Sequence, residues 1–411
     1  MAVAIVGTLD TKGTEVAYMR NLLQDAGINT LVVDVGSLGT PSIAADVTRE
    51  QVFTAAGTSL KAIQQAADRG HAVTLSADGA AKIVKRLHEE GRVQGVLGLG
   101  GSAGTTIGTA AMRVLPYGVP KVMVSTLASG QVQHYVGVRD ICMIHSVTDI
   151  CGLNRFTRKV LANAAAAMVG MIQAKPVVMN EDKPLIAATM FGVTTPCVEA
   201  ARKQIEEAGY EVLVFHATGT GGRTMEAMIA DGLIAGVLDV TTTELADELV
   251  GGILSAGRDR LTAAAIRGVP QVISLGALDM VNFGPVDSVP QKFEGRRFYQ
   301  HNASVTLMRT TPEENDQLGK EIAEKASASQ GPTAILIPLK GVSAIDREGG
   351  PFWWPEADAA LFQSIRNWVG PWVKLIEVDH HINDPEVAKI AAETLLAMLV
   401  NRDAKASRSG A

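Results

Sequence analysis

Short apolar runs alternate with longer amphipathic stretches along the first half of the chain. The runs Val3–Val6, Thr30–Val35 and Val93–Leu99 contain few polar residues, which is typical of parallel strands buried on both faces. Between the first two runs, the pattern predicts a helix over Thr14–Ala26, ended by Gly27. The pattern therefore predicts βαβ units and a parallel sheet. Further strands are predicted over Lys121–Ser125 and Ile141–His145, and helices over 47–91 and Arg155–Ala174.

The same pattern restarts after residue 183. The stretch AIVGTLDTKGTEVAYMRNLLQDAGINTLVVDVGSLG matches AATMFGVTTPCVEAARKQIEEAGYEVLVFHATGTGG, each giving strand, polar loop, helix, AG turn, strand and glycine loop. Later, QGVLGLGG matches AGVLDVTT. We therefore predict an α/β fold of two tandem, related, doubly wound (Rossmann-like) domains with mostly parallel sheets. The predicted domains cover 1–177 and 184–403, with a linker over 178–183 and a frayed tail over 404–411.

The length and composition are typical of two globular domains. A chain of 411 residues exceeds the usual size of one hydrophobic core, and 47% of its residues are hydrophobic. The 37 basic and 43 acidic residues give a net charge of −6, which argues against general nucleic-acid binding. No uncharged apolar run approaches the roughly 18 residues of a membrane span, and the N-terminus has the pattern of a strand rather than a signal peptide. The three cysteines form neither a CxxC motif nor a disulfide framework, so we expect a cytoplasmic protein.

The segment VLGLGGSAGTTIGTAAM, residues 96–112, is the best candidate anion site. Its glycines follow a predicted strand and open a predicted helix, where free amides and the helix dipole favour a phosphate. It lacks the GK[ST] ending of a P-loop. The alternative is a glycine turn that lets helix and strand pack closely. The matching segment AGVLDVTTTELADELVG has no glycine in its loop, so we infer that a ligand, not the scaffold, explains the glycines.

Other candidates follow neighbouring strands at the same predicted sheet edge. In GTLDTKGTE, Lys12 could neutralise phosphate charge and Asp10 could hold Mg²⁺ or a ribose hydroxyl, although a capped loop with a solvated lysine is an alternative. Asp34 could meet a ribose or cap its own loop. The loop STLASG could contact a ligand or form a plain turn. The candidate nucleotide-binding residues are Gly7, Thr8, Asp10, Lys12, Gly36, Gly100, Gly101, Ser102, Gly104, Thr105, Ser129 and Gly130.

The second domain offers weaker candidates. HATGTGGRT is rich in glycine, and SAGRDR contributes Arg258 and Arg260, which could bind an anion or lie on a surface helix paired with Asp259. His380 and His381 are adjacent, so they point apart on a strand and favour capping and packing over metal binding. PFWWPE is either a lid, an interface or a buried anchor. The candidate substrate-binding residues are Thr218, Gly219, Arg223, Thr242 and Arg258, and no metal-ligand set is predicted.

The motifs GTLDTKGTE, GLGGSAGT, STLASG and HSVTDICGLNRFTRKVLANAAAAMVGM resemble those of the tomato mosaic virus resistance protein-like ATP-binding family. The resemblance continues through VTLMRTTPEE, PLKGVSAID and HINDP, so it covers nearly the whole chain. It implies a nucleotide-binding first domain, a related second domain, and ATP with Mg²⁺ as ligand. The antiviral role of the plant member is not transferred, because partner recognition belongs to a surface and not to a fold.

Three functions follow as hypotheses. The first is a cytoplasmic ATP-binding protein, an ATP-dependent or nucleotide-regulated enzyme that holds a small anionic metabolite in a cleft between the domains and forms a homo-oligomer. The second is a non-catalytic nucleotide sensor or interaction protein. The third is an enzyme that binds a phosphorylated or carboxylate metabolite without nucleotide. Catalytic residues, and whether ATP is hydrolysed or only bound, do not follow from the sequence.

Overall fold

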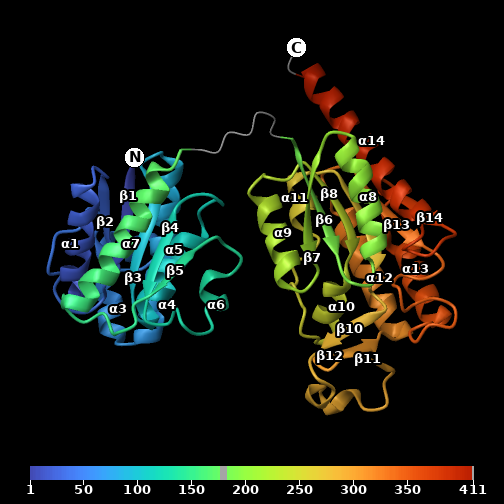
Figure 1. Ribbon diagram of the computed structural model, residues 1–411, viewed down its shortest axis with the longest axis horizontal. Coiled ribbons are helices and arrows are strands. Elements are labelled where there is room, and N and C mark those ends of the chain that lie inside the picture. Colours follow the sequence, from blue (N-terminus) through green and yellow to red (C-terminus); the bar gives the residue numbers. More distant parts are fainter. Residues whose placement is uncertain (176–182, 410–411) are drawn as a thin grey trace. The chain divides into compact units, whose positions relative to one another are not determined.

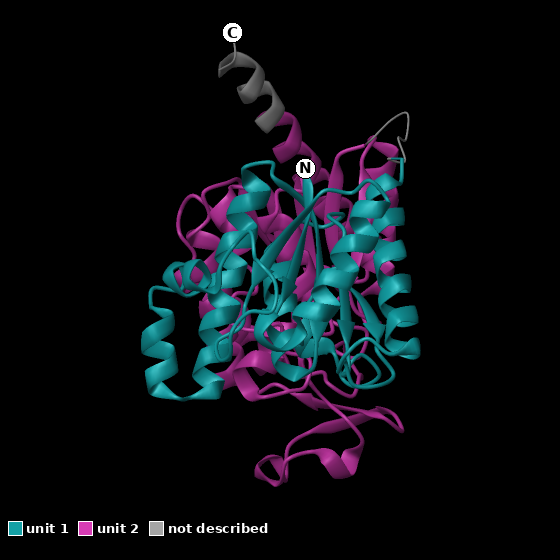
Figure 2. Ribbon diagram, turned by 90° about the vertical axis from the view of Figure 1, so that its left-hand side faces the viewer, with its two compact units in different colours: residues 1–178 teal, residues 179–411 magenta. Residues whose placement is uncertain are grey.

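The computed structural model describes residues 1–175 and 183–409 and divides the chain into two compact units, residues 1–178 (unit 1) and 179–411 (unit 2) (Figure 1, Figure 2). Of the predicted linker, only Lys183 lies within the described residues. Both units are α/β structures with mainly parallel sheets, so the predicted fold class is confirmed. Within the described residues, no helix has both the length and the apolar character that crossing a membrane requires.

Unit 1 contains one five-stranded parallel sheet in the order β2-β1-β3-β4-β5. The strands are β1 (Ala2–Gly7), β2 (Thr30–Asp34), β3 (Val93–Gly100), β4 (Lys121–Ser125) and β5 (Cys142–His145). The helices are α1 (Leu9–Asp25), α2 (Arg49–Ala55), α3 (Leu60–Ala66), α4 (Arg69–Glu89), α5 (Ser102–Arg113), α6 (Gln133–Val136) and α7 (Arg155–Gln173). The chain moves outward from β1 first to β2 and then, in the other direction, to β3. The strand order therefore reverses between β1 and β3, where open α/β sheets bind ligands.

Helices cover both faces of this sheet. Helices α1 and α7 pack on one face around Leu9, Val16 and Leu161, which are buried with the alternate residues of β1 and β3. Helices α4 and α5 pack on the other face, where Ile83 and Ile107 belong to a second buried cluster. The two clusters hold the carboxyl ends of β1 and β3 in fixed register.

The single helical stretch predicted over 47–91 is three helices. Each begins at a polar cap residue: Thr48, Ser59 and Asp68 accept hydrogen bonds from amides at the starts of α2, α3 and α4. Ala67 adopts a left-handed conformation, with φ of 51°, and ends α3 immediately before Asp68. The break matters for the site, because it starts α4 at Arg69.

Unit 2 contains a six-stranded parallel sheet in the order β14-β13-β9-β8-β6-β7. When only the strands of this sheet are counted in chain order, the strand order matches that of unit 1 and has one more strand at the edge. The sheet strands are β6 (Leu185–Met190), β7 (Glu211–His216), β8 (Gly236–Thr241), β9 (Gln271–Gly276), β13 (Thr333–Pro338) and β14 (Lys374–Val378). The α-helices are α8 (Thr195–Glu207), α9 (Thr220–Ala230), α10 (Thr243–Val250), α11 (Ala263–Arg267), α12 (Pro312–Ser327), α13 (Pro355–Trp368) and α14 (Pro385–Ser409).

An antiparallel extension interrupts unit 2 and was not predicted from the sequence. Strands β10 (Met280–Phe283), β12 (Val305–Arg309) and β11 (Phe298–Asn302) form a separate sheet, with the short 3₁₀ turns η1 (Val286–Ser288) and η2 (Gln291–Phe293) between them. Figure 1 shows it beyond the ends of the parallel strands of this unit. At the other extreme of the unit, α14 continues to Ser409, so the tail predicted to be frayed over 404–411 begins inside a helix.

Candidate functional site

A cavity of about 320 Å³ lies at the carboxyl ends of β1 and β3 in unit 1. It is placed at the strand-order reversal, and the first residues of α1, α4 and α5 converge on it. Its polar lining consists of Thr8, Asp10, Thr11, Lys12, Ser37, Arg69, Ser76, Ser102 and Asp149. Its remaining walls are the backbone of Gly100, Gly101, Ala103 and Gly104 and the apolar side chains of Val35, Leu38, Ala72, Val73 and Ile107.

The N-terminus of α5 opens onto this cavity. Gly101 is the N-cap residue, and the first intrahelical bond runs from the Thr105 amide to its carbonyl oxygen, at 2.8 Å. No side chain of a described residue caps this end. The first amides of a helix have no intrahelical acceptor, so those of Ser102, Ala103 and Gly104 are available to an anion, which the helix dipole also favours.

Close packing accounts for most of the glycines in this loop. A Cβ on Gly100 would lie 2.7 Å from the Cα of Gly104, and one on Gly104 would lie 3.0 Å from the Leu99 carbonyl oxygen. A Cβ on Gly98 would similarly lie only 2.7 Å from the Met123 sulfur. The inference that the scaffold does not require these glycines was wrong, because α5 packs directly on the end of β3. Gly101 is different: its Cβ would meet only the Thr126 hydroxyl, at 3.7 Å.

Two cationic side chains line the cavity without an anionic partner. Lys12 projects from the first turn of α1 and Arg69 from the first turn of α4. The structure places no hydrogen bond, ion pair or aromatic ring contact on either side chain within residues 1–175 and 183–409. Lys12 is predicted from its position after β1. Arg69 was missed, because its position depends on where α4 begins within the helical stretch over 47–91. The capping pattern of Asp68 could have located that start.

The two acidic candidates have local structural partners. The Asp34 carboxylate accepts hydrogen bonds from the amides of Leu9 (3.1 Å) and Gly36 (2.9 Å). Its burial raises the pKa of this carboxyl, and Asp34 caps its loop, as the second sequence hypothesis proposed. Asp10 lines the cavity and accepts the Leu38 amide at 3.0 Å. Gly36 permits this approach, since a Cβ there would lie 2.8 Å from the Asp10 carboxyl carbon.

Of the remaining predicted residues of unit 1, Thr8 lines the cavity, whereas the others lie outside its lining: Gly7, Thr105, Ser129 and Gly130. Gly7 ends β1, where a Cβ would lie 2.6 Å from Val16. Thr105 is buried, and its hydroxyl is 2.7 Å from that of Ser125. Ser129 and Gly130 belong to a turn in which the Gly130 amide donates to the Leu127 carbonyl, at 3.0 Å. Thr8 lines the cavity and pairs with the Thr11 hydroxyl, at 2.8 Å.

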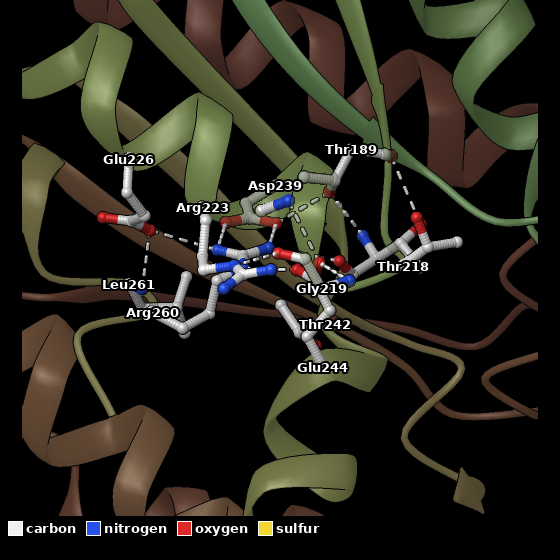
Figure 3. Close-up of polar contacts among 12 residues, drawn as sticks. Thr189, Thr218, Gly219, Arg223, Glu226, Asp239, Thr242, Glu244, Arg260 and Leu261 are labelled. Carbon is white, nitrogen blue, oxygen red and sulfur yellow. Dashed lines mark hydrogen bonds and ion pairs between the residues drawn. The ribbon is translucent and has the colours of Figure 1, made fainter. Parts of the chain in front are cut away.

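In unit 2, the glycine-rich loop between β7 and α9 already holds an anion from its own chain. Figure 3 shows the Glu244 carboxylate beside Gly219 and Arg260. Its Oε1 accepts the amides of Gly219 (2.7 Å) and Gly222 (3.0 Å), at the start of α9. Its Oε2 accepts the Arg260 Nε at 2.7 Å, and both side chains are fully buried. Glu244 therefore occupies the place that an external phosphate or carboxylate would take.

Arg260 joins three acidic side chains in the same cluster. It binds Asp239 with two nitrogens and also reaches Glu226, at 3.3 Å. Burial lowers the pKa of Arg260, but the surrounding carboxylates outweigh burial and raise it well above its usual value. Arg260 is thus neither a ligand-binding arginine nor a surface residue, which were the two sequence hypotheses. The sequence gives no sign of this cluster, because the acidic partners of Arg260 lie far from it along the chain.

The other substrate candidates of unit 2 are also engaged or remote. The Thr218 hydroxyl donates to the His216 carbonyl at 3.3 Å, and Arg223 Nε donates to the Gly219 carbonyl at 3.3 Å. Thr242 is buried and donates to the Ser274 carbonyl at 3.0 Å. The Arg258 side chain is 93% exposed, 3.7 Å from Glu248. Among the described residues, no cluster of three or more His, Cys, Asp or Glu side chains is arranged to hold a metal.

Family comparisons match both units. The description "Uncharacterised protein family (UPF0261) N-terminal domain" matches residues 1–176, and the corresponding C-terminal domain matches residues 183–399. The chain belongs to this family. It is 50% identical over 398 residues to a UPF0261 protein of Clostridium tetani, covering 97% of this chain and 98% of that protein. It is 42% identical over 337 residues to the ToMV resistance protein Tm-1(GCR237) of Solanum lycopersicum, covering 80% of this chain and 44% of that protein.

The similarity to the tomato protein confirms the family resemblance seen in the motifs. Among solved structures, a UDP-N-acetylglucosamine 2-epimerase from Rickettsia bellii is similar over 97% of this chain and 96% of its own, at 12% identity and a TM-score of 0.23. A likeness that distant carries no argument about the function of this UPF0261 member.

Proposed function

We propose that unit 1 binds ATP as its magnesium complex. The observation that carries the proposal is the meeting of the uncapped N-terminus of α5 with two unpaired cations, Lys12 and Arg69, in one cavity. Amides at a helix start and nearby cations are the groups that bind phosphate chains. In this proposal the phosphates lie against Gly101 and Ser102, and the two cations neutralise their charge.

The rest of the lining suits the other parts of the ligand. Val35, Leu38, Val73 and Ile107 give the cavity an apolar wall against which a purine ring can pack. Asp10 and Asp149 supply carboxylates on the polar side. Magnesium in nucleotide sites is commonly held by one or two carboxylates together with the phosphates, so these two residues would hold it.

We also propose that the protein acts in the cytoplasm as an ATP-dependent or nucleotide-regulated enzyme. The three cysteines are free thiols, which suits a reducing compartment. Glu244 fills the predicted anion site of unit 2, so that site gives this hypothesis no support. Steady release of ADP in the presence of a metabolite would indicate an enzyme, whereas saturable binding without release would indicate a sensor.

The phosphate assignment is tested by comparing Mg-ATP with adenosine. Lys12→Gln and Arg69→Gln should each weaken Mg-ATP binding about 10- to 100-fold, since a hydrogen bond to a charged group contributes about 1.5–3 kcal/mol. Adenosine binding should not change. Lys61→Gln is the matched control, because Lys61 is exposed on the neighbouring helix α3 and is not part of the cavity lining. Equal losses for ATP and adenosine, measured by titration calorimetry, would contradict the assignment.

A further inference from the structure

A second cavity, of about 410 Å³, lies at the end of β13 in unit 2. The loop after β13 forms one side through Leu339, Lys340 and Glu348, and the start of α13 forms the other through Asp358 and Phe362. Trp353, from the aromatic motif PFWWPE, also lines the cavity and is 45% exposed. The volume lies within the range of small-molecule sites.

One residue of the cavity lining, Asp358, belongs to a group of buried acidic side chains that continues behind the wall. Asp358 is 8% exposed and accepts Arg309 Nη2 at 2.6 Å through Oδ1. The same nitrogen lies 3.6 Å from Asp346 Oδ1, a buried oxygen that accepts no hydrogen bond from any residue that the structure describes. Asp279, also fully buried, accepts the Ser343 hydroxyl at 2.8 Å through Oδ2, while its Oδ1 has no hydrogen-bond partner in the described parts of the chain. These four side chains form the acidic cluster.

The acidic cluster lacks positive charge. It contains one guanidinium, that of Arg309, and three carboxyl groups. Arg309 also donates a hydrogen bond to the carbonyl of Phe352 at 2.7 Å. Burial raises the pKa of Asp358 to about 7, against the effect of Arg309. Burial and Asp346 raise the pKa of Asp279 to about 8. Asp358 and Asp279 therefore tend to retain their protons near neutral pH, and a cation arriving at Asp358 would take the place of the proton there.

The opposite side of the cavity carries a cation of its own. Lys340 is paired with Asp379 at 3.0 Å, and both side chains are largely exposed, 58% and 78%. An exposed pair of this kind contributes little free energy, so Lys340 can exchange Asp379 for a ligand carboxylate. Between these two ends, Trp353, Leu339 and Phe362 offer an apolar surface.

We propose that this cavity is a second ligand site, independent of the proposed nucleotide site, and that it binds a small metabolite of the amino-acid class. The ammonium group of the ligand pairs with Asp358, with Glu348 nearby, and its carboxylate pairs with Lys340. The aromatic and aliphatic wall contacts the carbon chain, and Trp353 also suits a neighbouring ammonium. A dicarboxylate would place an anion against Asp358, and a diamine would place a cation against Lys340, so the two ends together select a zwitterion.

The test is calorimetric titration of the full chain with the twenty common amino acids, with succinate and putrescine as single-charge-type probes. At least one amino acid should bind more tightly than both probes. Asp358→Asn should weaken that binding about 10- to 100-fold. Glu356→Gln, an exposed change on the same first turn of α13 and outside the lining, should leave it unchanged. Absence of amino-acid binding, tighter binding of succinate, or an unaltered affinity in Asp358→Asn would overturn the proposal.

Two further measurements keep the test decisive. If circular dichroism shows that Asp358→Asn does not fold, Lys340→Gln is compared with the wild type instead, since the exposed Lys340 side chain is not needed for packing. It should weaken amino-acid binding about tenfold or more and leave putrescine binding equal or tighter. Wild-type titrations in buffers of different ionisation enthalpy should show proton release near pH 7, because the ligand ammonium stabilises the ionised form of Asp358. The other charged or titratable groups around Asp358 are Asp279, Asp346, Arg309, Lys340 and Glu348. Proton uptake would contradict this arrangement.

Discussion

Removing the internal anion of unit 2 should destabilise that unit strongly. In Glu244→Ala, the amides of Gly219 and Gly222 and the Nε of Arg260 all lose a buried carboxylate acceptor. Breaking a fully buried, hydrogen-bonded ion pair costs about 3–5 kcal/mol. A domain of roughly 150–250 residues loses about 2–4 °C in Tm per kcal/mol. We therefore expect the unfolding transition of unit 2 to fall by roughly 6–20 °C in differential scanning calorimetry.

The same variant offers a chemical rescue. Inorganic phosphate can enter the vacated site at the start of α9 and should raise the transition of unit 2 above its value in chloride at equal ionic strength. Glu248→Ala is the matched control. Glu248 lies on the same helix, α10, is 29% exposed, lies near Arg258 and accepts a hydrogen bond from the Ser255 hydroxyl, so its loss should cost less, about 1–2 kcal/mol. A Glu244→Ala transition that falls no further than that of Glu248→Ala would refute the assignment of Glu244 as an internal anion.

Two further stability predictions follow. Gly100→Ala should destabilise unit 1 by about 1–3 kcal/mol, because its Cβ meets the backbone of Gly104 at 2.7 Å. Gly101→Ala should change the stability of unit 1 by less than about 1 kcal/mol. Chemical denaturation compares the two variants, and equal losses of stability would contradict the packing account. Asp279 binds a proton more tightly in the folded chain, with its pKa raised to about 8 by burial and Asp346, so its stabilising contribution is lost as pH rises from about 4 to about 8. The Tm of Asp279→Asn should therefore fall less than that of the wild type between about pH 5 and pH 8, and parallel profiles would contradict the buried proton.

The fold was predictable because its signals are local. Apolar runs such as Val3–Val6 are typical of buried strands, and Gly27 and Gly209 end helices with left-handed backbone (φ 78° and 94°). Within the antiparallel extension, β11, FYQHN, gives no burial pattern because it is largely exposed. Strand β10 is buried but has only four residues, which is too short to show a periodic pattern. The continuous helical composition of residues 47–91 hides the boundaries between α2, α3 and α4, which only the cap residues Thr48, Ser59 and Asp68 mark.

The candidate site was predictable only in part, because its geometry depends on long-range contacts. The position of Lys12 and the glycine loop followed from the strand-end rule, and both line the cavity. The reason for the glycines did not follow, since a sequence cannot show that Gly104 touches Gly100 across a turn. Glu244 lies 25 residues from Gly219 and 16 from Arg260, and nothing in local spacing brings them together.

Mg-ATP binding by Gly101→Val tests the central claim most directly. Gly101 lines the cavity, and its Cβ position is free of packing conflicts, so the valine side chain should extend into the proposed phosphate position without disturbing the fold. Titration calorimetry on the full chain should show Mg-ATP binding to the wild type and none to the variant, while circular dichroism and Tm stay nearly unchanged. A folded Gly101→Val that binds Mg-ATP as tightly as the wild type, or a wild type that does not bind it, would contradict the account.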